Sequence, residues 1–298
     1  MPFLFRQRAP LRTRDIQGLA RPECRLEGSG SFRIYTPRSV ETLAVKQKMT
    51  QTAKKSDFRV WVVPGVGFHD VVIETPVHSV HLSDLGPTQV GEVLLAYKKR
   101  IEQIKERDLI KYVQYDEALD CIYAGFSTLG MMARYLALPV IPPTVSGRLC
   151  SMKEYFDQTG KCGLCEVQPE DLLIDETTYF TSIVPFAATF PFEIWIIPRY
   201  HSSHFHDLDS EKAIDLGGLL KLMLRKLSMQ LNNPPFNFMI HTSPLQVTDS
   251  QSPYTHWYLQ IVPQLTGVGG FEIGTGCYIN PVFPDDAAKV LREVNIPV

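Results

Sequence analysis

The feature that most constrains the fold of this chain is a motif that occurs twice. An apolar stretch, then His-Ser-x-His and then Asp-Leu occupy residues 68–85 and again residues 192–208, and a long amphipathic pattern follows each copy. The spacing is too long for a solenoid repeat and indicates two copies of one domain-sized unit. A chain of 298 residues with 44% hydrophobic residues can give each unit a core. We therefore expect one unit at 58–145 and a second at 146–298, joined near 142–161.

Residues 1–57 differ in character from the two units. Up to position 40 there are eight arginines against Asp15, Glu23 and Glu27, and no helical or strand period persists. This composition is typical of an irregular, solvated tail. It also suits an organellar transit peptide, which is Arg-rich and poor in acidic residues. We predict an irregular Arg-rich segment here.

Charge and cysteine content exclude several classes of protein. A formal charge of −2 gives no basis for a nucleic-acid or membrane partner, and no apolar run is long enough to span a membrane. Six unevenly spaced cysteines do not form a disulfide framework and favour a reducing compartment. We predict a cytoplasmic protein, with organellar import through the Arg-rich N-terminus as the alternative.

The element order predicts an α+β fold. Residues 71–73, 109–113, 236–240 and 256–262 have the pattern of strands. One long helix is expected to start near Pro87, and a second to be capped by Asp209 or Ser210. Strand, long helix and strands in this order predict an antiparallel sheet with helices on one face. The residues expected to be buried at helical spacing are Val90, Val93, Leu94, Tyr97, Ile101 and Ile104 in the first helix, and Ile214, Leu219, Leu220, Met223 and Leu227 in the second.

A Cys-x-x-Cys pair is the sharpest chemical signal in the chain. Cys162 and Cys165 can place two thiolates on one side of a tight turn, as tetrahedral zinc requires. The pair alone also fits a redox couple or two unrelated cysteines. His201 and His256 lie at matching landmarks near predicted strands and would complete a Cys2His2 site. We predict one structural zinc ion held by these four residues, against the alternative of a buried cysteine pair beside surface histidines.

The other histidines carry weaker signals. His204 and His206 share a polar loop with His201, and we expect both to be solvated. His69 alternates with apolar neighbours on a predicted strand, which favours a position at the surface or the edge of the core.

A glycine-dense run follows the last predicted strand. Its glycines would let backbone amides approach a phosphate or a sugar. The run lacks the lysine of a P-loop and the position of a Rossmann fingerprint, so spacing alone predicts a turn-rich loop with ligand contact as the alternative. The candidate ligand-binding residues are Gly267, Val268, Gly269, Gly270, Glu272 and Ile273.

Three segments carry a resemblance to a known family. Residues 67–74, residues 137–145 and nearly everything from Tyr155 onward resemble the galactose-1-phosphate uridylyltransferases of the histidine-triad superfamily, with the plant ADP-glucose phosphorylase branch as the nearest likeness. The resemblance implies two histidine-triad-like domains, assembly as a homodimer, and transfer of a nucleotidyl group between a nucleotide sugar and a sugar 1-phosphate or phosphate through a histidine nucleophile. It also implies zinc on Cys162, Cys165, His201 and His256, and contact of the 267–273 loop with the nucleotide sugar.

The chain departs from this family at the nucleophile. Family members carry His-x-His-x-Gln just before Ala-Leu-Pro, whereas Ala137-Leu138-Pro139 is preceded here by residues 130–136, with Met132 at the nucleophile position. A thioether cannot form the phosphoramidate, and no histidine lies between His81 and His201. Residues 114–136 do not match the family, so we predict a disrupted first unit.

The chain also lacks most of the ligands of the family's first metal site. Its upstream Cys-x-x-Cys is missing from residues 1–65, and only His78 is retained, so we predict that this site is empty. Two interpretations of 114–136 are open: real divergence, or an alternative exon, an out-of-frame segment or a gene-model error. We predict a family protein without turnover, with a nucleotide-sugar-binding or structural zinc module as the alternative and the choice of adenine or uridine undecided.

Overall fold

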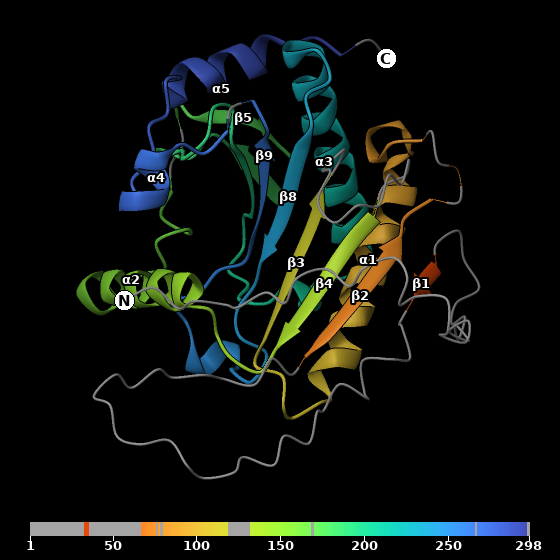
Figure 1. Cartoon of the computed structure of the whole chain (residues 1–298), viewed down its shortest axis with the longest axis vertical. Helices are drawn as coiled ribbons and strands as arrows, with labels where there is room; N and C mark the ends of the chain where they lie inside the picture. The colour runs from red at the N-terminus through yellow and green to blue at the C-terminus, as the bar shows by residue number, and fades with distance from the viewer. Residues whose placement is uncertain are drawn as a thin grey trace, which may run out of the picture.

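The structure is a computed structural model that describes residues 33–35, 67–75, 77, 80–118, 132–167, 170–265 and 267–296. Most of the predicted Arg-rich segment, His78 of the predicted empty metal site, and residues 119–131 lie outside these residues. Figure 1 shows one continuous twisted sheet with two long helices, α1 and α3, packed behind it. In the described part of the chain, no helix is both long and apolar enough to cross a membrane.

Within the described residues the sheet has nine strands, and every neighbouring pair is antiparallel. Their order is β1-β2-β4-β3-β8-β9-β7-β6-β5. The α+β prediction with an antiparallel sheet is thereby confirmed. The strands are β1 (Arg33–Tyr35), β2 (Phe68–Ile73), β3 (Tyr112–Ala118), β4 (Met132–Leu138), β5 (Leu173–Glu176), β6 (Phe180–Ile183), β7 (Ile194–Pro198), β8 (Phe236–His241) and β9 (Tyr258–Pro263).

The two long helices begin where the sequence predicts. Helix α1 (Pro87–Lys105) starts with a proline, whose missing N–H would have no helical partner there. Helix α3 (Ser210–Leu231) is capped by Asp209, whose side chain accepts a hydrogen bond of 2.8 Å from the Lys212 amide. The other helices are η3 (Leu82–Asp84), α2 (Pro143–Thr159), η4 (Phe205–Asp207), η5 (Asp249–Gln251), α4 (Gly270–Thr275) and α5 (Pro284–Glu293).

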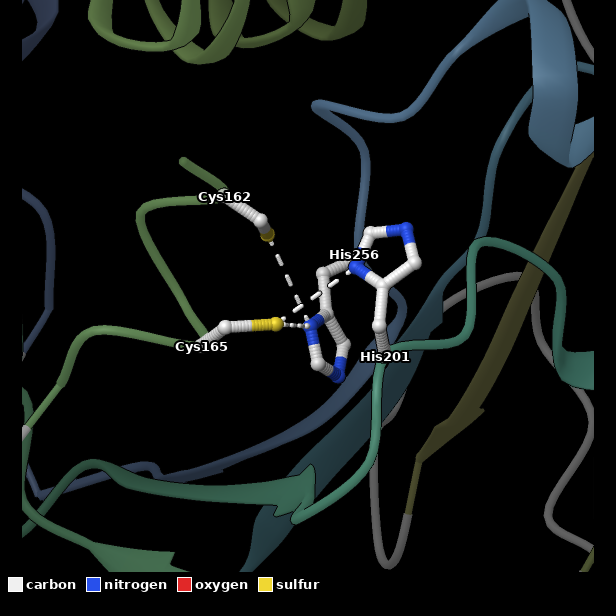
Figure 2. A group of neighbouring side chains, drawn as sticks. All are labelled: Cys162, Cys165, His201 and His256. Atoms are coloured by element: carbon white, nitrogen blue, oxygen red, sulfur yellow. Dashed lines mark hydrogen bonds between the residues drawn. The ribbon is translucent and has the colours of Figure 1, made fainter. Parts of the chain in front are cut away.

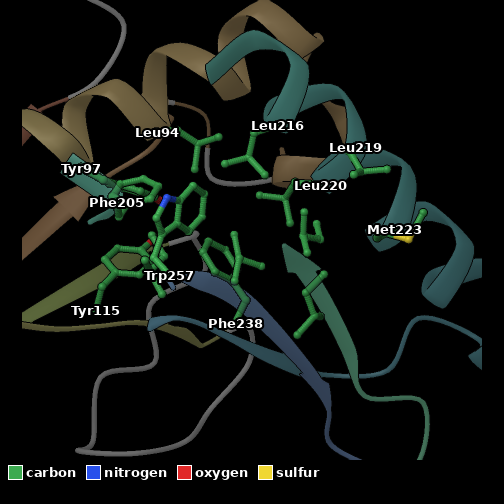
Figure 3. Packing of buried hydrophobic residues seen from close by; sticks show 14 of the residues in the cluster. Leu94, Tyr97, Tyr115, Phe205, Leu216, Leu219, Leu220, Met223, Phe238 and Trp257 are labelled. Carbon is green, nitrogen blue, oxygen red and sulfur yellow. The ribbon is translucent and has the colours of Figure 1, made fainter. Parts of the chain in front are cut away.

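One hydrophobic core lies between the sheet and the helices α1 and α3 (Figure 3). Phe205 and Trp257 pack there edge to face, with ring centroids 5.2 Å apart. All the helical residues predicted to be buried are buried except Ile214, which is 42% exposed. That prediction was wrong because the backbone of Ile214, rather than its side chain, faces the neighbouring helix at Gly91.

On each side of the β3–β8 junction, the three nearest strands follow in the same order relative to their long helix. In each direction come a middle strand (β3 or β8), the last strand of the half (β4 or β9), and then the strand that precedes the long helix (β2 or β7). This symmetry agrees with two copies of one unit, although the boundaries 58–145 and 146–298 stay a prediction.

Two segments differ from the sequence-based expectation. Strand β3 begins at Tyr112 instead of Leu109, and β3 and β4 keep both ends of the segment 114–136 in the sheet. The joint predicted at 142–161 is largely a helix, α2, of which only Val145 is fully buried. Val145, Leu149, Met152 and Phe156 recur at helical spacing, so the sequence carries a helical pattern that the polar composition of residues 151–161 masks.

Candidate metal centre

The four predicted metal ligands lie together (Figure 2). The ligand atoms of Cys162, Cys165, His201 and His256 are all within 4.8 Å of one another. Both imidazoles present Nδ1: the Cys165 sulfur is 3.5 Å from His201 Nδ1 and 3.4 Å from His256 Nδ1, and the Cys162 sulfur is 3.7 Å from His256 Nδ1. The cluster can therefore hold a metal ion.

These spacings fit tetrahedral zinc. Ligands at about 2.3 Å for sulfur and about 2.0 Å for nitrogen, separated by a tetrahedral angle, lie about 3.6 Å apart. Two thiols and two imidazoles are also the donor set typical of structural zinc. Four protein ligands leave no open position for water or substrate, so the geometry suits a structural ion rather than a catalytic one.

The end of α2 delivers the two cysteines. Gly160 terminates the helix in the left-handed conformation (φ 71°), which glycine adopts without a steric penalty. The chain then turns through a knuckle in which the amides of Cys165 and Glu166 donate to the Cys162 carbonyl, at 3.1 and 3.3 Å. These bonds place both sulfurs on the inner side of the turn.

The two histidines come from loops that are bound to each other. His201 follows β7 and His256 precedes β9. The Trp257 amide donates to the Ser202 carbonyl at 2.9 Å, and the Trp257 indole donates to the Ser202 hydroxyl at 3.1 Å. Ser203 also donates to the Thr255 carbonyl at 3.2 Å. Hydrogen bonds between the neighbours of His201 and His256 therefore hold the two loops together and position the imidazoles.

Electrostatics at the cluster disfavour protonated histidine and ionised thiol. Burial, with the imidazole of His201 next in importance, lowers the pKa of His256 to about 4, while the Pro198 carbonyl acts in the opposite sense. Partial burial, followed by the neighbouring Cys162 thiol, raises the pKa of Cys165 to about 12. A bound divalent cation would compensate the charge of thiolates at this site.

The prediction that His204 and His206 are solvated was wrong. They are 3% and 5% exposed. The loop folds into η4 against α1, where Lys105 Nζ lies 3.0 Å from His206 Nε2, and His204 Nε2 lies 3.3 Å from the Pro244 carbonyl. A polar local sequence does not reveal this packing because the partners are distant in the chain. His69 is exposed, as expected.

The glycine run is largely exposed. The prediction of a turn-rich loop was wrong for Gly270–Thr275, which form helix α4, and this helix has no buried residue. Val268 is 49% and Ile273 75% exposed. The cavities beside the metal cluster, about 440 Å³ next to Cys165 and about 270 Å³ next to His201, are not lined by the glycine run.

Met132 is the first residue of β4. It pairs with Ile73, the last residue of β2, in a regular antiparallel ladder. The position predicted for the nucleophile therefore lies at the end of a formed strand pair.

The sequence did not predict a series of hydrogen-bonded polar side chains on the face of the sheet opposite α1 and α3. Arg148 of α2 donates to His241 Nδ1 at 2.8 Å, and His241 Nε2 lies 2.6 Å from Gln260 Oε1. Gln260 donates to the buried carboxylate of Glu193 at 2.7 Å. These residues are far apart in sequence and follow no motif, so no sequence signal could have identified this hydrogen-bonded series.

Comparisons with known proteins give one consistent likeness, although no protein-family model matches the chain. An ADP-glucose phosphorylase from Arabidopsis thaliana is 63% identical over 234 residues, which cover 78% of this chain and 66% of that protein, just under two thirds of its length. A galactose-1-phosphate uridylyltransferase from Thermotoga maritima is 26% identical over 78% of this chain and 76% of its own length. The crystal structure of an Arabidopsis thaliana ADP-glucose phosphorylase with bound ADP-glucose superposes with a TM-score of 0.78 at 56% identity, covering 89% of this chain and 83% of that one.

Proposed function

Because the chain belongs to the galactose-1-phosphate uridylyltransferase family and resembles its plant ADP-glucose phosphorylases, we propose that it binds a nucleotide sugar without transferring the nucleotidyl group. The ligand would be of the ADP-glucose or UDP-glucose type. The observation that carries the proposal is 56% identity, at a TM-score of 0.78, to a crystal structure that contains ADP-glucose. The partners of this chain would be a nucleotide sugar, a sugar phosphate and a second copy of the chain.

The glycine run supports a binding role. A Cβ at Gly267 or Gly270 would meet no atom within 4 Å, and neither residue has a positive φ. The fold of the chain therefore does not require glycine at these positions. Close approach of the backbone to a ligand is another reason for a glycine. Binding through Gly267, Val268, Gly269, Gly270, Glu272 and Ile273 is the function we assign to this exposed surface.

The missing nucleophile supports the absence of transfer. In the family reaction a neutral imidazole attacks phosphorus and later leaves, which few side chains can do at neutral pH. The sequence from His81 to His201 contains no other histidine, and Met132 stands at the start of β4. In the sequence, no histidine stands at or near position 132 to take the place of that imidazole.

We propose zinc at Cys162, Cys165, His201 and His256. The spacing of the four donor atoms and their chemistry favour this ion. Zinc would supply a structural cross-link between the end of α2 and the loops beside β7 and β9.

Two measurements test nucleotide-sugar binding. We expect calorimetric titration of the full chain to give heat with ADP-glucose or UDP-glucose, and the Gly267→Ala/Gly270→Ala variant to bind at least tenfold more weakly because added Cβ atoms keep the ligand from the backbone. The melting temperature of that variant should not fall below the wild-type value, since both Cβ atoms would be in open space. Gly276→Ala is the control for the stability measurement. Gly276 has φ 70°, which alanine adopts only with strain, so this variant should melt at a lower temperature than wild type. No heat with either nucleotide sugar would eliminate the binding function.

The second candidate is the transfer activity of the family, between a nucleotide sugar and a sugar 1-phosphate or phosphate. The intact second half and the strand pair β2–β4 favour it. Incubation with a radiolabelled nucleotide sugar separates the two candidates. We expect no labelled protein, whereas an acid-labile, histidine-linked adduct would establish transfer.

A further inference from the structure

Helix α2 is attached to the sheet by very little apolar surface. Val145 is its one buried residue, Met152 packs partly buried against the small cluster of Ile183, Ile197 and Tyr258, and the centroid of the Phe156 ring lies 6.4 Å from that of Tyr254. Apart from Val145, this apolar stripe is only partly buried. A polar contact adds to these apolar contacts in positioning α2.

Arg148 supplies that interaction. Its guanidinium donates to His241 Nδ1 at 2.8 Å and lies over the Tyr258 ring, 5.7 Å from the centroid. His241 ends β8 and Tyr258 begins β9, so one side chain binds α2 to two neighbouring strands. A guanidinium suits this position because it can donate in its plane and stack on an aromatic face at the same time.

The acceptor of Arg148 is fixed by further hydrogen bonds. Because arginine can only donate, His241 Nδ1 must be the acceptor, which leaves Nε2–H to donate to Gln260 Oε1 at 2.6 Å. Gln260 in turn donates to Glu193 Oε1 at 2.7 Å. Burial and then Arg148 lower the pKa of His241 to about 3, which keeps the ring neutral and able to accept.

Glu193 is the last residue of this hydrogen-bonded series, which begins at Arg148. It is 1% exposed, and its carboxylate also accepts from the Trp195 indole at 2.7 Å and from the amides of Thr189 and Phe190 at 2.9 and 3.2 Å. An arginine and a buried carboxylate are thus joined through two neutral side chains, whose hydrogen bonds reinforce one another in a low-dielectric environment. The result is a rigid support for Arg148.

This support lies between the two sources of metal ligands. The end of α2 leads through Gly160 to Cys162, and Tyr258 follows His256 by two residues. We propose that Arg148 is a positioning residue for the metal centre: it holds α2 where Cys162 and Cys165 meet His201 and His256. This inference rests on the proposed zinc site.

The test compares zinc affinities measured by competition with a chromophoric chelator. We expect Arg148→Met to weaken zinc binding at least tenfold and Arg148→Lys to recover part of that loss. Lys153→Met is the matched control on the same helix, since Lys153 forms an exposed ion pair with Asp157 away from the sheet contacts of Arg148, and it should bind within twofold of wild type. An affinity of Arg148→Met within twofold of wild type would overturn the proposal.

Amide hydrogen exchange of the chelator-treated protein distinguishes failure of the inference from failure of the zinc site. In Arg148→Met, exchange in residues 160–166 should accelerate at least tenfold while α3 keeps its protection. If wild type binds no zinc but this acceleration occurs, the zinc assignment fails and the positioning of the knuckle stands. If wild type binds no zinc and exchange in residues 160–166 is also unchanged in Arg148→Met, Arg148 does not position the knuckle. Arg148→Lys serves both assays should Arg148→Met fail to fold.

Discussion

Histidine has several roles in this chain, and its surroundings decide between them. His201 and His256 face two thiols, His204 and His206 are buried beside α1, and His241 is held between an arginine and a glutamine. The clustering of these two histidines with Cys162 and Cys165 could be predicted because Cys-x-x-Cys and the repeated landmark are local patterns. The environments of the other three depend on contacts with distant residues, which a local sequence pattern does not encode.

His241 should make stability depend on pH. Its pKa in the folded chain is about 3, below the 6.5 of an unperturbed histidine. The unfolded chain therefore binds the extra proton as pH falls, so this stabilisation is complete above about 6.5 and is lost toward 3. We expect the free energy of unfolding to fall between pH 7 and pH 5, with up to about 1.4 kcal/mol per pH unit from this group.

Urea denaturation of wild type and His241→Gln at pH 7, 6 and 5 checks this expectation. Glutamine can accept from Arg148 and donate to Gln260, but it does not titrate. The variant should therefore show the smaller pH slope. His256, whose pKa is also lowered, is present in both proteins and cancels from the difference. Equal slopes would show that His241 does not contribute.

At the scale of elements, burial decides which helices the sequence predicts. Helices α1 and α3 bury continuous apolar stripes, so their starts were predicted correctly, and every position predicted to be buried except Ile214 is buried. Helix α2 buries only Val145 and leaves the other members of its apolar stripe partly exposed, and the short helix α4 buries no residue, so the patterns of both are weaker. The position of α2 depends instead on polar contacts of Arg148, which become apparent only in three dimensions.

The crossing of α1 and α3 should be sensitive to one methyl group. A Cβ on Gly217 would lie 2.6 Å from the Pro87 carbonyl oxygen and 2.8 Å from the Gly91 nitrogen, both backbone atoms that cannot move alone. Gly217→Ala should therefore separate the helices and destabilise the fold by about 1–3 kcal/mol, despite the better helix propensity of alanine.

Gly218→Ala is the matched control for this prediction. Its Cβ would lie 3.7 Å from Pro87 Cβ, an ordinary contact. This substitution should stabilise the helix by up to about 1 kcal/mol. Urea denaturation of both variants measures the difference, and similar effects of the two substitutions would argue against a close helix crossing.

At the scale of the whole molecule, the two halves share one sheet. Strands β3 and β8 pair edge to edge, from Tyr115 opposite Ile240 to Ala118 opposite Asn237. The repeated motif predicts two units, but it contains no signal for which strand edges meet. Pairing between edges is set by long-range contacts, and the same local pattern is compatible with separate domains. The shared core of α1 and α3 joins the halves on the other side of this junction.

This shared architecture determines how metal removal should affect the protein. The proposed zinc ion binds only second-half residues, yet the core behind the sheet runs through both halves. Removing the ion should therefore lower the melting temperature of one cooperative transition, rather than detach the second half. With free zinc at about 100 times its dissociation constant, the ion contributes about 2.7 kcal/mol, or roughly 5–10 °C for a chain of this size.

Differential scanning calorimetry of chelator-treated and zinc-restored protein measures both properties. The ratio of van't Hoff to calorimetric enthalpy should stay near one in either state, because a single unit unfolds. Cys162→Ser/Cys165→Ser should melt at one temperature with and without added zinc, since two of the four ligands are gone. A second transition appearing after chelation would mean that the β3–β8 junction does not couple the halves. A shift in melting temperature equal to that of wild type in the cysteine variant would place the ion elsewhere.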